Sequence, residues 1–100
     1  MEIKTVVEQT KATFEVIGKL NVQTAPELEA AIEAAPEDVS DIAIDLTEVD
    51  YVSSAGLRVF VAAGKLAARR GGSFVLMHPR DDVMEVLEMT GLSDVLTVEA

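Results

Sequence analysis

Short runs of apolar and β-branched residues alternate along this chain with longer stretches in which apolar residues recur every three or four positions. The short runs predict strands and the longer stretches predict amphipathic helices. The predicted strands cover residues 3–7, 12–17, 42–46, 74–77 and 95–98, and the predicted helices run from Thr24 to Pro36, from Gly56 to Gly71 and from Asp81 to Gly91. The order β-β-α-β-α-β-α-β, opened by a hairpin, indicates one α/β domain over residues 1–100, with right-handed crossovers between parallel strands.

The connections are predicted from turn and capping residues. Residues 18–23 are expected to form a loop, and residues 47–50 a tight polar connection. The apolar run 74–77 is expected to be covered on both faces of the sheet. The expected helix caps are Thr24, paired with Glu27 three residues later, and Asp81 or Asp82.

The composition and net charge of the chain exclude several kinds of site and binding partner. The 100 residues include no cysteine, which excludes disulfides and cysteine-ligated metals. The net charge of −10 argues against nucleic acid or a bare membrane surface and favours a protein partner with a basic face. No apolar run approaches the roughly 18–20 residues that span a bilayer, and the first residues lack the layout of a secretory signal, so a cytoplasmic protein is expected.

The candidates for catalysis are weak. A small hydrolase could use Ser54 with His78, but residues 52–56 supply only the second glycine of the Gly-x-Ser-x-Gly elbow. The glycines match no phosphate-cradling or dinucleotide motif, and the acids of residues 27–50 are spread as on a solvated surface. We therefore predict no catalytic residue, no cofactor and no metal.

The segment Ser53–Leu57 places two hydroxyls at a strand-to-helix junction. One reading is purely structural: Ser54 or Ser53 caps the helix and contributes about 1 kcal/mol. The other is functional, because a helix start can also hold a phosphate, which adds about −1.5 to −2 charge to whatever surface docks there.

Four segments, in this order, resemble the bacterial anti-sigma factor antagonists, the single-domain STAS proteins. They are Gly18–Ala25 (GKLNVQTA), Ile44–Leu46 with Asp50–Leu57 (DYVSSAGL), Arg70–Leu76 (RGGSFVL) and Val83–Leu92 (VMEVLEMTGL). The resemblance implies a mixed sheet with helices mainly on one face. It also implies a regulator of transcription and stress responses that binds an anti-sigma factor serine kinase, is released when that kinase phosphorylates a serine at the helix start, and is reset by a serine phosphatase.

The chain departs from the family pattern at two places. The family signature is Asp-Ser-Ser-Gly-Leu, with the phosphate on the second serine, and alignment on Gly56 and Leu57 puts Ala55 at that position. We therefore predict phosphorylation at Ser54, with Ser53 as second choice. Asn21 stands where the family loop has Asp, which keeps the hydrogen-bonding shape and removes a charge.

The predicted partner surface combines the loop, the junction and the edge of the following helix. Its residues are Asn21, Thr24, Tyr51, Ser53, Ser54, Ala55, Gly56, Leu57 and Arg58. The alternative is a STAS-like regulatory subunit of a membrane lipid-transport ATPase, which would bind a nucleotide-binding protein without phosphorylation; the missing hydroxyl at Ala55 favours it.

Overall fold

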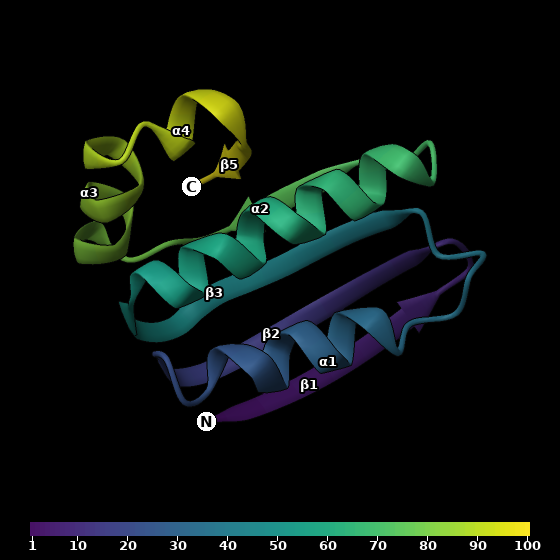
Figure 1. Ribbon diagram of the computed structural model, residues 1–100, viewed down its shortest axis with the longest axis horizontal. Coiled ribbons are helices and arrows are strands. Elements are labelled where there is room, and N and C mark those ends of the chain that lie inside the picture. Colours follow the sequence, from purple (N-terminus) through teal and green to yellow (C-terminus); the bar gives the residue numbers. More distant parts are fainter.

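The computed structural model describes residues 1–100 as one five-stranded sheet in the order β1-β2-β3-β4-β5 with four helices (Figure 1). The elements are β1 (Glu2–Glu8), β2 (Lys11–Leu20), α1 (Ala25–Glu33), β3 (Asp41–Val52), α2 (Ser54–Arg69), β4 (Phe74–Met77), α3 (Asp81–Met89), α4 (Leu92–Val95) and β5 (Thr97–Glu99). Every predicted helix and strand is present, and the predicted α/β class is confirmed. The short helix α4 was not predicted.

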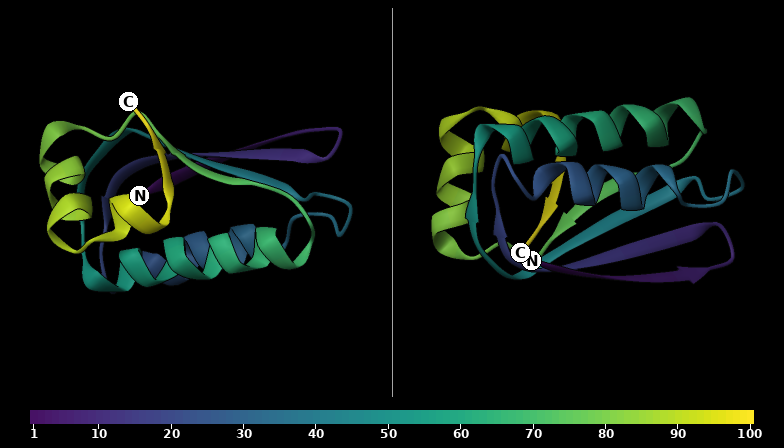
Figure 2. Two further views of the ribbon diagram at one scale, coloured as in Figure 1. Left: turned by 90° about the horizontal axis from the view of Figure 1, so that it is seen from above. Right: turned by 60° about the horizontal axis from the view of Figure 1, so that its bottom comes forward.

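The sheet is mixed. Strands β1 and β2 pair antiparallel across a two-residue turn in which Gln9 has a positive φ of 55°, and β2, β3, β4 and β5 are parallel to one another. Helices α1 and α2 lie side by side on one face of the sheet, and the opposite face carries no helix (Figure 2). The expectation of helices mainly on one face is therefore confirmed.

The core lies between the sheet and this helix layer, and no polar or charged residue is buried. Alternate residues of β2 and β3 point into it, including Phe14, Ile44 and Leu46, each 0% exposed. The expectation that residues 74–77 are covered on both faces is wrong: Phe74 and Leu76 are buried, but their neighbours are only half-buried, because no element covers the second face.

Two strands are longer than predicted. Residues 18–20 belong to β2, and residues 47–52 continue β3, so the predicted loop at 18–23 is shorter and the predicted connection at 47–50 does not exist. The parallel pairing shifts register between Glu15 and Ile17 and again between Gly18 and Lys19. These irregularities interrupt the period of two on which the sequence prediction depended.

The predicted caps also differ. Neither Thr24 nor an aspartate caps its helix through the side chain, and α3 starts after Arg80. The predicted end of this helix at Gly91 is confirmed, because Gly91 has a φ of 79°, which terminates the helical path after Thr90.

Candidate functional site

The ends of β2 and β3 bring two distant motifs together. Leu20 and Val52 form the last pair of the parallel ladder, and the Ser53 N–H donates to the Leu20 carbonyl oxygen at 2.8 Å. The chain then continues into the Asn21 loop on one side and into α2 on the other. The two motifs of the predicted partner surface are therefore neighbours.

The Asn21 loop is held by its own side chains. Asn21 Oδ1 accepts the N–H groups of Gln23 and Thr24 at 2.9 and 3.0 Å. Thr24 Oγ1 accepts the Asn21 N–H at 2.8 Å and donates to the Lys19 carbonyl oxygen at 2.8 Å. Thr24 thus closes the loop instead of capping α1, which corrects the predicted pairing with Glu27. The closed loop presents Val22, 72% exposed, at its tip.

Asn21 provides a stability test of this loop. Asn21→Ala removes the acceptor of two backbone N–H groups, one exposed and one half-buried, and we expect it to lower the free energy of unfolding by about 1 kcal/mol. Asn21→Asp keeps an oxygen in the same place, close to the start of α1, and is expected to retain stability within about 0.5 kcal/mol. Urea denaturation of both variants measures the difference, and equal losses would show that Oδ1 does not hold the loop.

Ser53 is the cap of α2. Its backbone is extended, with ψ at 173°, and its Oγ accepts the Gly56 N–H at 3.3 Å, while its carbonyl oxygen accepts the Leu57 N–H at 3.0 Å. Ser54 is the first residue of the helix and is exposed. The two hydroxyls therefore differ: that of Ser53 is engaged in the cap, and that of Ser54 lies at the surface.

The next residues fix the helix start on the sheet. Gly56 is buried, and a Cβ there would lie 2.8 Å from Leu20 Cγ and 3.0 Å from Val52 Cγ1. Only glycine lets α2 approach the ends of β2 and β3 this closely. Ala55 and Leu57 are half-buried and pack against the core. The position of the family's usual phosphate acceptor is therefore less accessible here than Ser54.

Ser54 lines an open groove of about 360 Å³ between α2 and the α3–α4 connection. Leu57, Arg58 and Val61 line it from α2, and Thr90 and Leu92 from the other side. Arg58 is exposed and stands one turn after Ser54. Val61, Thr90 and Leu92 were not predicted as part of this surface, because neither α4 nor its position beside α2 is evident from the sequence pattern.

Tyr51 lies at the edge of this region. It is 49% exposed and pairs with Lys19 in the ladder, next to a weak ion pair between Lys19 Nζ and Asp50 Oδ2 at 3.6 Å. Since both partners of the ion pair are exposed, it contributes little to stability. The exposed phenol adds a large contact surface beside the junction.

The residues of the hydrolase alternative lie apart. His78 follows Met77, which pairs with Asp45 in the first half of β3, whereas Ser54 follows the far end of that strand. The His78 N–H donates to the Glu99 carbonyl oxygen at 2.7 Å. A Ser54–His78 pair is therefore not formed, and this alternative is wrong.

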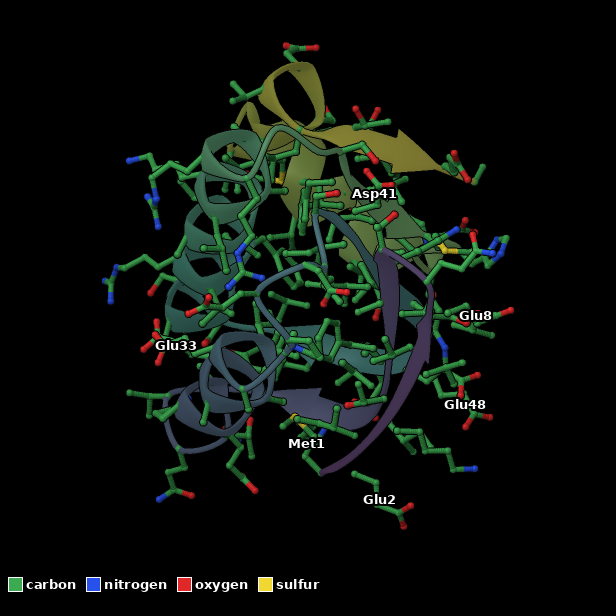
Figure 3. The ribbon with its side chains drawn as sticks, turned by 90° about the vertical axis from the view of Figure 1, so that its right-hand side faces the viewer. Met1, Glu2, Glu8, Glu33, Asp41 and Glu48 are labelled. Carbon is green, nitrogen blue, oxygen red and sulfur yellow. The ribbon has the colours of Figure 1, made fainter.

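The acids are distributed over the surface. Figure 3 shows Glu33 on the helix side of the molecule and Glu8 and Glu48 on the other. No group of three or more histidine, aspartate or glutamate residues is placed to hold a metal ion. None of the helices has the length and apolar character that crossing a bilayer requires.

A known family of domains matches almost the whole chain. The STAS domain model matches residues 2–100. The chain belongs to the STAS domain family. It is 31% identical to the anti-sigma-B factor antagonist of Bacillus subtilis over 100% of this chain and 94% of that protein.

Solved STAS structures share the fold. An anti-sigma factor antagonist from Mycobacterium paratuberculosis superposes with a TM-score of 0.81 at 28% identity, over 98% of this chain and 86% of that one. The unphosphorylated form of the antagonist SpoIIAA has a TM-score of 0.81 at 16% identity, over 99% of this chain and 89% of that one. At 16% identity, the similarity to SpoIIAA shows only that the two proteins share a fold.

Proposed function

We propose that this STAS domain is an anti-sigma factor antagonist that binds an anti-sigma factor serine kinase and is released by phosphorylation of Ser54. The docking surface comprises the Asn21 loop, Tyr51, the Ser53–Leu57 junction and the groove with Arg58. The observation that carries the proposal is the exposed hydroxyl of Ser54, at the start of α2 and on the lining of the groove. The relatives named as antagonists support the partner class.

Ser54 fits the role better than its neighbours. Ser53 is half-buried and its Oγ accepts the Gly56 N–H, so this hydroxyl would have to leave the cap before a kinase could reach it. Ala55 has no hydroxyl. A phosphate on Ser54 would stand in the first turn of α2, where the helix dipole favours negative charge, so the folded state would tolerate it.

The charge of a phosphate on Ser54, and the loss of water around it, would separate the chain from its partner. A phosphate adds about −1.5 to −2 charge to a chain of net charge −10. The groove around Ser54 is lined by Leu57, Val61 and Leu92, so a partner that covers it would remove water from the new dianion. Arg58 also lines the groove and could pair with the phosphate, but it would then be lost as a contact for the partner, and the charge that remains in a covered interface costs several kcal/mol, which is enough to separate the complex. A serine phosphatase in the cytoplasm would then restore binding.

Site mapping tests the proposal directly. The full chain is incubated with ATP and a purified anti-sigma factor kinase from the same genome, and the product is analysed by mass spectrometry. We expect one phosphate, on Ser54, and none on Ser54→Ala. Ser73→Ala, which changes an exposed serine outside the docking surface, should be phosphorylated like the wild type. A phosphate confined to Ser53 or absent altogether would contradict the assignment.

One observation favours a second candidate. Ala55 has no hydroxyl at the family's acceptor position and is half-buried, as a STAS-like subunit of a lipid-transport ATPase that works without phosphorylation would allow. Such a subunit would bind the nucleotide-binding protein of a transporter and fail to bind the serine kinase. Parallel binding assays with both purified partners separate the two functions.

A further inference from the structure

We propose that β1 is a self-association edge, along which a second copy of this chain pairs antiparallel and extends the sheet into a symmetric dimer. This inference is independent of the proposed antagonist function.

The free edge of β1 is long and regular. β1 is the outermost strand, and all its residues from Glu2 to Glu8 pair with β2 without a bulge. Its side away from β2 has no strand partner, and the strand contains no proline. Unpaired backbone groups along such an edge are a template for another strand, and proteins usually interrupt it with a bulge, a proline or a covering segment. β1 has none of these three devices, and its charged side chains, which can also protect an edge, are of both signs: Glu2, Lys4 and Glu8.

The centre of this edge is apolar on both faces. Val6 and Val7 are each 44% exposed. Val6 pairs with Thr13 on the helix-free face, and Val7 pairs with the buried Ala12 on the helix face. The helix layer therefore leaves Val7 open to solvent, although Val7 points toward it. A second strand alongside would cover both valines.

Charge complementarity selects the register. In a two-fold dimer with both helix layers on the same side, a register centred on Val6 places Val6 opposite Val6 of the second copy. It also places Lys4 opposite Glu8 of the second copy, twice by symmetry. A register centred on Thr5 would place Glu2 opposite Glu8 of the second copy. A register centred on Lys4 would place the two Lys4 side chains opposite each other. Both are disfavoured, because like charges directly opposite each other are destabilising.

The ion pairs continue a row of alternating charge. Within each copy, Lys4 pairs across the sheet with Glu15, and Glu8 pairs with Lys11. In the Val6-centred register the row across the dimer would read Glu15, Lys4, then Glu8 and Lys11 of the second copy. Every charge in this row has neighbours of opposite sign, which offsets part of the repulsion between two chains of net charge −10.

This edge is remote from the groove beside Ser54. In Figure 1, β1 runs along one side of the molecule, and α3, α4 and β5 lie along the other. The sheet order likewise places β1 and β5 at opposite edges. A dimer through β1 would leave the groove open in both copies.

Sedimentation equilibrium of the full chain tests the dimer, with protein from about 10 μM to about 1 mM, and we expect a reversible monomer–dimer equilibrium. Lys4→Glu and Glu8→Lys should each weaken dimerisation about tenfold, and the double variant should associate more tightly than either single variant, although it places like charges opposite Glu15 and Lys11 within each copy. Glu8→Lys removes one acid and adds one base, so the charge changes from −10 to −8. Reduced repulsion alone would therefore strengthen association, the opposite of the expected result.

Glu99→Lys is the matched control, because it makes the same change of charge at an exposed position on β5, the edge strand opposite β1, and it should not weaken the dimer. A chain that stays monomeric over the whole range overturns the proposal. So does a dimer that the single variants leave unchanged, or one that the double variant weakens further than either single variant does.

A cross-link gives a second readout that is specific to the register. Since the chain has no cysteine, Val6→Cys introduces one thiol that would face its own copy across the two-fold axis. We expect oxidation to convert this variant to a disulfide-linked dimer several-fold faster than Val22→Cys, whose side chain is more exposed at 72%. Equal rates for the two variants would contradict the register.

Discussion

Ser54→Asp is expected to weaken binding of the anti-sigma factor kinase at least about a hundredfold, which corresponds to about 2.7 kcal/mol. The carboxylate would lie in a groove lined by Leu57 and Leu92, where a docked partner removes water from the charge, and pairing with the neighbouring Arg58 would withdraw that guanidinium from the docking surface. Ser54→Ala removes an exposed hydroxyl that does not cap the helix, and its affinity should stay within about threefold of wild type. Isothermal titration calorimetry with the purified kinase measures both.

Gln9→Asp controls for the charge itself. Gln9 lies in the turn between β1 and β2, at the opposite end of β2 from the Asn21 loop, and its substitution adds the same charge as Ser54→Asp. This control should bind like wild type. Equal losses for Gln9→Asp and Ser54→Asp would mean that net charge, and not position, governs the affinity, and the phosphorylation switch would lose its basis.

The part of the site that is local in sequence was predictable. Two serines before a glycine and an apolar helix indicated a strand-to-helix junction with a capping hydroxyl, and Ser53 is that cap. The pattern alone left the choice between Ser53 and Ser54 open. The structure shows which serine forms the cap, because Ser53 Oγ accepts a backbone N–H, whereas phosphorylation of Ser54 stays a prediction.

The parts that depend on tertiary contacts were not predictable. Thr24 lies before a helix with Glu27 three residues later, so its sequence matches a capping box, yet its hydroxyl bonds to Lys19 and Asn21 within the loop. The pairing of Leu20 with Val52 extends both strands through residues whose pattern has no strict alternation. The groove needs Thr90 and Leu92, which are distant from Ser54 in the sequence, and no local signal joins them to it.

Gly72→Ala is expected to be the most destabilising single substitution considered for this chain, at about 3 kcal/mol or more. A Cβ on Gly72 would lie 1.9 Å from the carbonyl oxygen of Ser40, and this oxygen belongs to the backbone, so no side-chain rotation relieves the overlap. The two segments are also bonded to each other: the Ser73 N–H donates to Asp41 Oδ1 at 2.9 Å, and Arg70 Nη1 donates to the Val39 carbonyl oxygen at 2.9 Å. Moving the segments apart would stretch these bonds as well.

Gly71→Ala separates this close approach from backbone strain. Gly71 has a φ of 75° and nothing within 4 Å of its Cβ position, so alanine there suffers only the unfavourable backbone conformation, about 1–2 kcal/mol. Urea denaturation of the two variants should therefore show a clearly larger loss for Gly72→Ala. Because a small domain has a free energy of unfolding of about 5–15 kcal/mol, the Gly72 loss removes a substantial share of it. Equal losses at the two glycines would show that the contact with Ser40 relaxes at little cost, and the segments joining α1 to β3 and α2 to β4 would then be less tightly packed than their hydrogen bonds indicate.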